Sequence, residues 1–454
     1  MKVILFGLGN YYGRFRKYFN DNDIVVLCDN NKERQGEIVD GKLVIAPEKI
    51  EQYEYDKIYI LSSYIKEIRR QLISLGVIEK KIVSYYDVKI SVNQYKKYEG
   101  DLSKKDYSSD ILIIASDMNN SGATVALLEV VRQINVLGEK NIVVATPLDG
   151  ELTEKFVNTC SEFIIDPRLL SGTLNDIEWT SKYSVIFVNT VHMFYLFRDR
   201  KLSTKIIWWL HEPSMFYSNV DSEILKSLDY SNLDIYAVSK VAINAFMETG
   251  CLEKCRTLVC GKTDIPRNNP VKKRDAQIAF ITVGGVMNIK GQDVLVSAVR
   301  KLCEYGYDNF SVKLIGYESG SFAENLKRMC LDYNLPVVFC GAMRNEEVLT
   351  NIENSDVLIC SSREETLSIA AIEAMMKRIP CIVSSTAGIS EYIQDFDNSI
   401  IFESTNSDDL CEKMKWCLDN HSILPTMGNL ARELYEQVFS TKHLLAQLDI
   451  ILRN

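Results

Sequence analysis

The sequence is poor in several features that mark whole classes of protein. It has 9 prolines and 22 glycines in 454 residues, too few for long disordered tracts. Its longest apolar stretches, such as residues 206–210, fall far short of the roughly 20 apolar residues that a membrane-spanning helix needs. The first ten residues, MKVILFGLGN, lack the long apolar core and cleavage site of a secretory signal, so we expect none.

Positive charge is also in short supply. Lys and Arg total 52 against 61 Asp and Glu, which gives a net charge of −9. This balance argues against a general nucleic-acid-binding protein, although a small basic pocket for a phosphorylated ligand is compatible with it. Hydrophobic residues make up 46% and charged residues 25%, so we expect a globular cytoplasmic protein of roughly two to four domains.

The sequence has no CxxC motif and only 4 histidines. Its 12 cysteines are scattered through expected strands and helices, which is typical of buried thiols in a reducing compartment. The tightest cluster, Cys251, Cys255 and Cys260, has no neighbouring histidine to complete a zinc site. We therefore expect neither a disulfide framework nor a metal site.

What the chain does have is a repeated alternation of short apolar runs with amphipathic segments. Runs this apolar, separated by helices, predict parallel sheets that are covered on both faces. They are too many for one sheet, so we expect three α/β units. The runs are residues 2–7, 23–29, 57–63, 110–116, 141–146, 184–190, 205–210, 234–239, 278–285, 311–316, 336–341, 356–362 and 381–385.

Two charged, polar segments have the composition of linkers. They are residues 93–109 and 266–275. They divide the chain into units at 1–95, 110–265 and 276–430, and we expect helices over 431–454.

In the first unit, Gly7, Gly9 and Gly13 follow the first apolar run, and Asp29 ends the second. Such glycines let a chain approach a diphosphate at a helix start, and an acid about 20 residues on suits a ribose hydroxyl. The G-x-G-x-x-x-G spacing departs from the stricter fingerprint, so the glycines serve either a nucleotide or chain geometry alone. The unit loosely resembles small Rossmann-like modules attached to bacterial polysaccharide-synthesis enzymes.

In the second unit, polar residues stand where expected strands end. Asn189 ends one strand, and His211 and Glu212 end the next, while Gly122 precedes a periodic helix. The carboxyl ends of parallel strands are where α/β sheets bind ligands. His211 is either functional or a structural histidine, and its place beside Glu212 favours function.

The third unit carries the strongest pattern. Lys290 and a glycine precede a helix expected from Gln292, which makes an anion site at exposed helix-start amides. Glu365 and Glu373 follow another strand, with a helix whose N-cap we expect at Thr366. A further strand leads to a loop at residues 388–391. We expect these three loops to share one crevice.

In this order, the motifs resemble those of family-4 glycosyltransferases, which have the GT-B architecture of two Rossmann-like domains that face a cleft. The resemblance covers about residues 110–454. Its markers are the SGA turn, WWLHEP, AVSKVAINAF, VGG…KGQD, SDVLICSS, E-x7-E and TAGISE. It implies an acceptor-side domain at 110–265, a donor domain at 276–430, C-terminal helices at 431–454 that pack back on these domains, and a small Rossmann-like accessory domain at 1–95.

The resemblance implies a retaining enzyme that moves a sugar from a UDP- or GDP-linked donor without a metal or other cofactor. The acceptor would be a glycan, a glycolipid or a protein-linked glycan in bacterial surface polysaccharide synthesis, with passing contact at the inner face of the membrane and no nucleic acid. It implies catalytic roles for His211, Glu365 and Lys290, and acceptor-side roles for Asn189 and Glu212. The donor-binding residues it implies are Gly122, Gly284, Gly285, Lys290, Glu365, Thr366, Leu367, Ser368, Glu373, Gly388 and Ile389.

The sequence also departs from the family pattern. Gly285 stands where the family often has an arginine, so one cation for the diphosphate is missing. Residues 366–368 replace the common Gly-Phe-Gly run and change the sugar pocket. Two alternatives therefore stay open: a catalytically weak GT-B partner that binds glycan, or a nucleotide-linked oxidoreductase or epimerase that uses residues 1–95.

Overall fold

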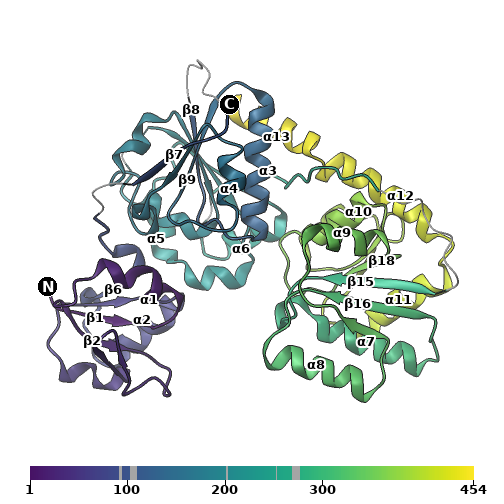
Figure 1. Ribbon diagram of the computed structural model, residues 1–454, viewed down its shortest axis with the longest axis horizontal. Coiled ribbons are helices and arrows are strands. Elements are labelled where there is room, and N and C mark those ends of the chain that lie inside the picture. The colour runs from purple at the N-terminus through teal and green to yellow at the C-terminus, as the bar shows by residue number, and fades with distance from the viewer. Residues whose placement is uncertain (92–94, 103–109, 201–202, 252, 268–276, 454) are drawn as a thin grey trace. The chain divides into compact units, whose positions relative to one another are not determined.

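The computed structural model describes residues 1–91, 95–102, 110–200, 203–251, 253–267 and 277–453 and contains three sheets (Figure 1). The chain groups into two compact units. The first holds residues 1–127, 138–235 and 245–255, and the second holds residues 128–137, 236–244 and 256–454. The division into domains at 1–95, 110–265, 276–430 and 431–454 stays a prediction.

The first sheet has the strand order β3-β4-β2-β1-β5-β6. All neighbours are parallel except the β3–β4 pair. The order reverses at β1, which places a crevice at the carboxyl ends of β1 and β5. The elements are β1 (Val3–Phe6), α1 (Asn10–Phe15), β2 (Ile24–Cys28), β3 (Ile38–Val39), β4 (Lys42–Ile45), β5 (Lys57–Ile60), α2 (Ile65–Ser74) and β6 (Ile82–Ser84).

The second sheet has the order β14-β13-β12-β11-β8-β9-β10-β7. Its strands are β7 (Lys96–Glu99), β8 (Asp110–Ile114), β9 (Asn141–Thr146), β10 (Glu162–Ile165), β11 (Val185–Asn189), β12 (Lys205–Leu210), β13 (Leu233–Ala237) and β14 (Cys255–Thr257). Its helices are α3 (Gly122–Leu137), α4 (Thr153–Val157), α5 (Ser222–Ser227), α6 (Lys240–Met247) and the 3-10 helices η5 (Pro167–Leu170), η6 (Glu178–Lys182), η7 (Val191–Phe197) and η8 (Ser214–Asn219).

The third sheet is parallel, in the order β17-β16-β15-β18-β19-β20. Its strands are β15 (Ile278–Val283), β16 (Phe310–Ile315), β17 (Val337–Phe339), β18 (Val357–Cys360), β19 (Cys381–Ser384) and β20 (Ile400–Phe402). The helices are η9 (Asn288–Lys290), α7 (Gln292–Glu304), α8 (Gly320–Asp332), α9 (Asn345–Glu353), α10 (Ile369–Met376), η10 (Gly388–Tyr392), α11 (Ser407–Asp419), α12 (Leu424–Leu434), η11 (Tyr435–Phe439) and α13 (Thr441–Arg453).

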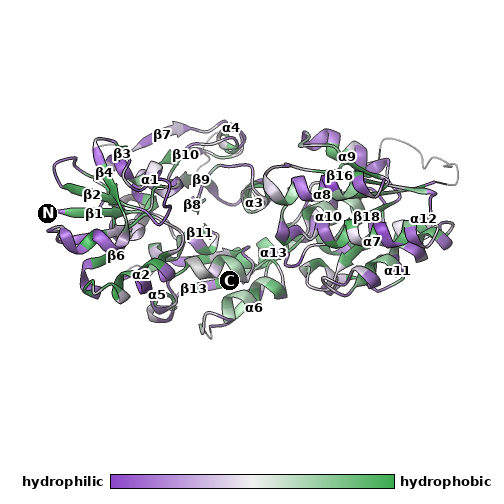
Figure 2. Cartoon of the chain, turned by 90° about the horizontal axis from the view of Figure 1, so that it is seen from below, coloured by the Kyte–Doolittle hydropathy of each residue, from purple (hydrophilic) through white to green (hydrophobic). Residues whose placement is uncertain are grey.

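Every apolar run that predicts a strand overlaps one, which confirms the parallel α/β class. The predicted linker at 93–109 is partly wrong, because residues 96–99 form β7, an antiparallel partner of β10. Its four exposed residues, KKYE, have no apolar period, and β7 is mostly purple in Figure 2, whereas β1 and β2 are green. Residues 103–109 and 268–275 of the predicted linkers lie outside the described residues.

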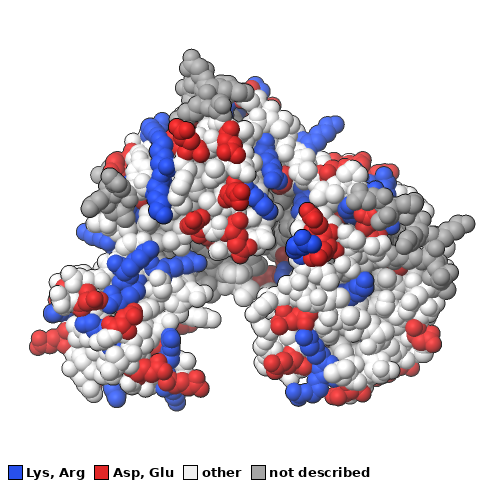
Figure 3. Space-filling view, in the orientation of Figure 1, with Lys and Arg blue, Asp and Glu red and all other residues white. Residues whose placement is uncertain are grey.

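The described residues lack three features. None of the described helices combines the length and the apolar character needed to cross a bilayer. All the cysteines are free thiols, and no group of His, Cys, Asp or Glu in the described ranges is arranged to hold a metal. On the face drawn in Figure 3, basic and acidic side chains are interspersed.

Candidate functional site

The loop after β15 is built to hold Lys290 at the start of α7. Gly291 has a left-handed backbone (φ 65°), and a Cβ there would stand 2.1 Å from the carbonyl oxygen of Ser361. The buried Gln292 side chain accepts a hydrogen bond from the Met287 amide (3.3 Å) and donates one to the Gly285 carbonyl (2.9 Å). The loop is therefore fixed from within before any ligand is considered.

Lys290 and Glu365, which lie in two of the loops named in the sequence analysis, are in direct contact. The Lys290 ammonium donates to the Glu365 carboxylate, which also accepts from the Ser362 hydroxyl at 3.3 Å. Burial acts to lower the pKa of Lys290, but the attraction of the Glu365 carboxylate outweighs it, so the pKa is raised. Lys290 is therefore a permanent cation beside a carboxylate.

Arg363 is a cation of the same region that the sequence reasoning missed. Its guanidinium binds both oxygens of Asp293 (2.8 and 2.6 Å) and donates to the carbonyl of Asn288 (2.5 Å). The hydrogen bond to Asp293 raises the pKa of Arg363. Arg363 thus ties the β18–α10 loop to η9, but Asp293 already offsets its charge, so it does not simply replace the arginine missing at Gly285.

Glu373 is buried in α10 and paired with a second unpredicted cation. The Lys262 ammonium lies 2.7 Å from the Glu373 carboxylate, and Asn345 donates to it at 3.3 Å. Lys262 is itself held because its amide donates to the Phe439 carbonyl (2.8 Å). No motif in the sequence marks Lys262, since its partner is 111 positions away in the printed numbering.

The polar turn before α10 begins the helix later than the sequence predicts. Ser368, not Thr366, is the N-cap: its backbone is extended and its hydroxyl accepts from the Ala371 amide at 3.3 Å. The prediction of Thr366 fails because threonine and serine are both good N-cap residues, so residue type alone does not decide between them. In the structure, residues 366 and 367 belong to the loop that carries Glu365. Thr366, Leu367 and Ser368 are all buried.

Gly388 and Ile389 lie in the next loop, and both are buried. A Cβ at Gly388 would stand 1.9 Å from the Thr366 carbonyl oxygen. The Gly388 amide donates to the Glu365 carbonyl (2.8 Å), and the Ser390 amide donates to the Ala387 carbonyl (2.8 Å). The Gly388 amide therefore fastens this loop to the one that carries Glu365, whereas the Ser390 amide closes a turn within its own loop.

Gly284 and Gly285 follow β15 directly. Gly284 has φ 151°, and its amide donates to the Ile315 carbonyl at 2.8 Å. A Cβ at Gly285 would meet the flexible end of the Met287 side chain at 3.0 Å and would lie 3.8 Å from the Tyr317 carbonyl oxygen, an ordinary van der Waals distance. Gly285 therefore has room for a side chain, and sterics alone do not require glycine there.

In the second sheet, Gly122 begins α3 just after β8. A Cβ on Gly122 would meet no atom within 4 Å, so the helix start is open. The Ser121 hydroxyl accepts from the Thr124 amide at 3.3 Å. The long helix α3 thus presents a capped but accessible N-terminus at the carboxyl end of the sheet.

Thr190, at the end of β11, has a strained backbone that the sequence does not reveal. Its φ of 75° is costly for a β-branched residue. The Trp208 indole donates to its carbonyl (2.8 Å), and its own amide donates to the Trp209 carbonyl (2.9 Å). Within the described part of the chain, the buried Thr190 hydroxyl and the Asn189 side-chain carbonyl have no hydrogen-bond partner, while the Asn189 amide group donates to the Ala123 carbonyl (3.1 Å).

His211 and Glu212 follow β12. The Glu212 carboxylate is buried and accepts from the backbone amides of Val191 and His211, each at 3.0 Å, so it holds the strained turn. The His211 ring packs against Trp209 with centroids 4.2 Å apart. Burial lowers the pKa of His211 to about 3, which keeps the imidazole neutral at physiological pH.

The glycines of the first unit line a separate cavity of about 520 Å³. Gly7, Gly9 and Asp29 are among its lining residues, whereas Gly13 is not. Gly13 instead lies inside α1 and faces solvent.

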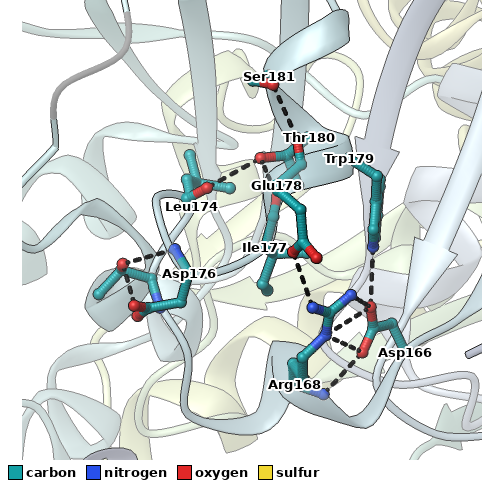
Figure 4. Close-up of polar contacts among 10 residues, drawn as sticks. Asp166, Arg168, Leu174, Asp176, Ile177, Glu178, Trp179, Thr180 and Ser181 are labelled. Atoms are coloured by element: carbon teal, nitrogen blue, oxygen red, sulfur yellow. Dashed lines mark hydrogen bonds and ion pairs between the residues drawn. The ribbon is translucent and has the colours of Figure 1, made fainter. Parts of the chain in front are cut away.

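A buried polar cluster lies after β10, and nothing in the sequence singles it out (Figure 4). Asp166 is fully buried and accepts from the Arg168 guanidinium (2.8 Å) and the Trp179 indole (2.8 Å). The exposed Glu178 contacts the same guanidinium at 2.8 Å. These contacts fasten η5 to η6 and do not involve the predicted site residues.

Two known families match separate segments of the chain. Residues 264–436 match the glycosyl transferases group 1 family, and residues 1–83 match the family described as C2185-like, N-terminal. The first match contains every predicted donor-binding residue except Gly122. The second contains the cavity of the first sheet.

Curated relatives match shorter stretches. An uncharacterized glycosyltransferase of Methanocaldococcus jannaschii is 27% identical over 33% of this chain and 41% of its own length. The sulfoquinovosyl transferase SQD2 of Arabidopsis thaliana is 26% identical over 35% of this chain and 30% of its own length. The chain thus spans less than half the length of these relatives.

Solved structures cover more of the chain and share its fold. Anabaena HepE in complex with UDP and glucose superposes with a TM-score of 0.62 at 14% identity, over 76% of this chain and all of that one. A glycosyltransferase from Rickettsia africae superposes with a TM-score of 0.61 at 17% identity, over 76% of this chain and 98% of that one. The chain therefore has the parallel-sheet α/β fold of the GT-B glycosyltransferases, and its residues 264–436 are similar to the glycosyl transferases of group 1.

Proposed function

We propose that the protein is a retaining glycosyltransferase that moves a sugar from a nucleotide-diphosphate donor, UDP- or GDP-linked, to a glycan, glycolipid or protein-linked acceptor. The observation that carries the proposal is the contact of Lys290 with Glu365 beside the start of α7, inside the matched family segment. The acceptor belongs to bacterial surface polysaccharide synthesis. An uncharacterized protein of the Klebsiella pneumoniae cps region, 24% identical over 53% of this chain, supports this assignment.

Lys290 acts on the leaving group. Breaking the bond at the anomeric carbon leaves negative charge on the diphosphate, and a fixed ammonium beside helix-start amides stabilises that charge. The raised pKa of Lys290 keeps it charged throughout the reaction. When the diphosphate takes up the ammonium, the Glu365 carboxylate is free to accept hydroxyl hydrogen bonds from the donor sugar.

Glu373 serves the nucleoside end of the donor. Its carboxylate is held by Lys262 and Asn345 and has further lone pairs for ribose hydroxyls. Thr366, Leu367 and Ser368 shape the sugar pocket, and Gly388 and Ile389 set the loop beside it. The domain boundaries at 276 and 430 enclose these donor residues.

Some acceptor-side residues are placed to contact the substrate, and one holds the backbone around them. Asn189 and Thr190 offer buried oxygen atoms with spare hydrogen-bonding capacity. His211, kept neutral by burial, suits a hydrogen bond to an acceptor or sugar hydroxyl without adding charge. Glu212 is a positioning residue, since its Oε2 atom accepts hydrogen bonds from two backbone amides.

The mechanism needs no protein nucleophile and no metal in this proposal. The leaving phosphate takes the proton from the acceptor hydroxyl on the same face of the sugar, which retains the configuration. A membrane-proximal acceptor fits the exposed side chains of Met215 and Phe216 on η8, which are 50% and 39% exposed. The aromatic-rich residues 193–197 are buried in the core and take no part in such a contact.

Nucleotide release from a panel of UDP- and GDP-sugars tests the proposal. We expect one donor to be turned over, and Lys290→Ala or Glu365→Gln to lower kcat about 100- to 1000-fold. The matched controls are Lys301→Ala and Glu304→Gln, which remove side chains from the far end of α7. Full activity in both site variants contradicts the site assignment.

A second candidate is a catalytically weak partner subunit that binds glycan. Gly285 favours it, because the cation expected there is missing and Arg363 is neutralised by Asp293. This candidate predicts donor binding without turnover by the purified chain. Sugar transfer by the chain alone rules it out.

A further inference from the structure

The cavity in the first sheet lies where three loops meet at the carboxyl ends of neighbouring strands. It is lined by the turn after β1, the end of β2, and the segment from β5 into α2. Because the strand order reverses at β1, these loops diverge and leave a crevice between them. Its volume of about 520 Å³ is in the range of small-molecule sites.

The β1–α1 turn is shaped to let a ligand approach the backbone. Gly7 has φ 99°, and a Cβ there would stand 2.9 Å from the Leu61 carbonyl oxygen, so only glycine fits. Gly9 has ordinary dihedral angles and open space around its missing Cβ. The glycine at position 9 is therefore not required by the fold, and it leaves room in the cavity.

The charges that line the cavity are of one sign. Among the described residues, Asp29 and Glu67 are the only charged ones that line the cavity, and none of the lining residues is Lys or Arg. Asp29 is already bound by the backbone amides of Leu8 and Asn31, both at 2.8 Å. A nucleoside diphosphate would bring about two to three negative charges next to these two carboxylates, with no described cationic side chain in the lining to offset them. The Arg34 guanidinium donates to the Leu8 carbonyl at 2.8 Å and the Arg14 guanidinium lies over the Tyr11 ring, but neither side chain lines the cavity.

The remaining lining residues suit an uncharged ligand with a ring and hydroxyl groups. Tyr64 lines the cavity with a ring that is 64% exposed, and Tyr11 lines it from α1. Asn30 and Gln71 exchange two hydrogen bonds, at 3.0 and 2.9 Å, and present their amide groups to the cavity as well. Rings stack on a flat base, while carboxylates and amides bind hydroxyls.

We propose that this cavity is a second small-molecule site, distinct from the donor site, which binds a nucleoside or a closely similar uncharged ring with hydroxyl groups and discriminates against its diphosphate. The glycine turn of residues 7–9 admits the ligand to the backbone, Tyr64 stacks on the ring, and Glu67 accepts hydroxyl hydrogen bonds. Asp29 is a positioning residue that shapes the turn.

The site is coupled by packing to the sheet that carries Asn189 and His211, within the same compact unit. The Tyr11 ring lies 4.6 Å from Tyr85, and Tyr85 lies 6.4 Å from Tyr195 on η7, between centroids. Ring packing therefore connects one wall of the cavity to η7, the segment that follows the strained Thr190.

Calorimetric titration of the full chain with uridine, cytidine, adenosine and guanosine, and with the four matching 5′-diphosphates, tests the proposal. We expect one nucleoside to bind with a Kd below about 1 mM. Gly9→Leu, which fills the cavity, abolishes that binding, whereas Gly13→Leu, a matched change outside the cavity, leaves it intact. Glu67→Gln weakens it several-fold.

Lys290→Ala separates the two sites. It leaves nucleoside binding unchanged and weakens diphosphate binding, while Gly9→Leu does the reverse. The proposal is overturned if no nucleoside binds, if Gly9→Leu leaves nucleoside binding intact in a folded protein, or if a diphosphate binds the Lys290→Ala chain as tightly as its nucleoside. Loss of diphosphate binding alone bears on the donor site and not on this one.

Discussion

Single glycines decide where the charged groups of the donor site stand. Gly291 and Gly388 leave no space for a side chain, because a Cβ would stand 2.1 and 1.9 Å from a carbonyl oxygen. Such positions cannot be told from ordinary loop glycines in one sequence. Gly285, which the family pattern makes conspicuous, has room to spare.

We therefore expect Gly291→Ala to lower the unfolding free energy strongly and Gly285→Ala to change it little. At Gly291 two destabilising effects combine: the left-handed backbone is unfavourable for alanine, and the new Cβ clashes with the Ser361 carbonyl oxygen. We therefore expect the unfolding free energy to fall by more than about 2 kcal/mol. At Gly285 the new Cβ displaces only the flexible end of the Met287 side chain and lies 3.8 Å from the Tyr317 carbonyl oxygen, so we expect the unfolding free energy to change by no more than about 0.5 kcal/mol. Denaturant unfolding of the two variants measures the difference, and equal losses contradict the geometry.

His211 gives a pH-dependent prediction at the same scale. The unfolded chain protonates this residue below about pH 6.5, whereas burial lowers its folded pKa to about 3. Between these values unfolding takes up a proton, so the free energy of unfolding falls as the pH falls. Between pH 7 and pH 5, we expect the free energy of unfolding to fall by about 1–2 kcal/mol less in His211→Gln than in the parent chain. Parallel curves over that range contradict a buried neutral imidazole.

Among the secondary-structure elements, those whose position is set by burial of apolar side chains could be predicted from the sequence. The central strands are continuous apolar runs because both faces are buried. The strands missed were edge or short ones, such as β7, with four exposed residues, and β14, whose burial is only partial. Lys290 with Glu365 could also be predicted, since each follows a strand end, but Lys262 with Glu373 could not, because tertiary packing alone joins them.

The cluster that fastens η5 to η6 should dominate the stability of that region (Figure 4). Asp166→Ala leaves the Arg168 guanidinium, which is 15% exposed, without its main partner, so we expect a loss of about 3–5 kcal/mol. Glu178→Ala removes a carboxylate that is 79% exposed from the same arginine and should cost less than about 1 kcal/mol. Thermal or denaturant unfolding compares them, and similar losses would show that Asp166 is not the anchor.

At the scale of the molecule, the first and second sheets are joined within one compact unit by a cation. The Arg198 guanidinium binds the Asp87 carboxylate (2.8 Å) and the Tyr86 carbonyl (2.6 Å), and lies 5.2 Å from the centre of the Tyr86 ring. The Tyr86 hydroxyl donates to Asp221 at 3.0 Å. The extra N-terminal segment is therefore packed against its neighbour and is not a loose appendage.

Arg198→Ala should weaken this junction. The change removes the charge-assisted hydrogen bond to Asp87 and leaves the Tyr86 carbonyl without the arginine donor. We therefore expect the free energy of unfolding to fall by about 2–3 kcal/mol, and proteolysis of residues 1–88 to be faster. Lys226→Ala, which removes a mostly exposed partner of Glu223, is the control and should change little. Unchanged proteolysis in Arg198→Ala contradicts the role of this arginine.

The central claim is that the cation at the start of α7 holds the donor diphosphate. Titration of UDP and GDP into the full chain, into Lys290→Ala and into the control Lys301→Ala tests it most directly. The account predicts that one nucleotide binds the parent chain and Lys301→Ala alike, and that Lys290→Ala weakens its binding at least tenfold, or about 1.4 kcal/mol. Binding of neither nucleotide, or equal binding by Lys290→Ala and the parent chain, would contradict the account.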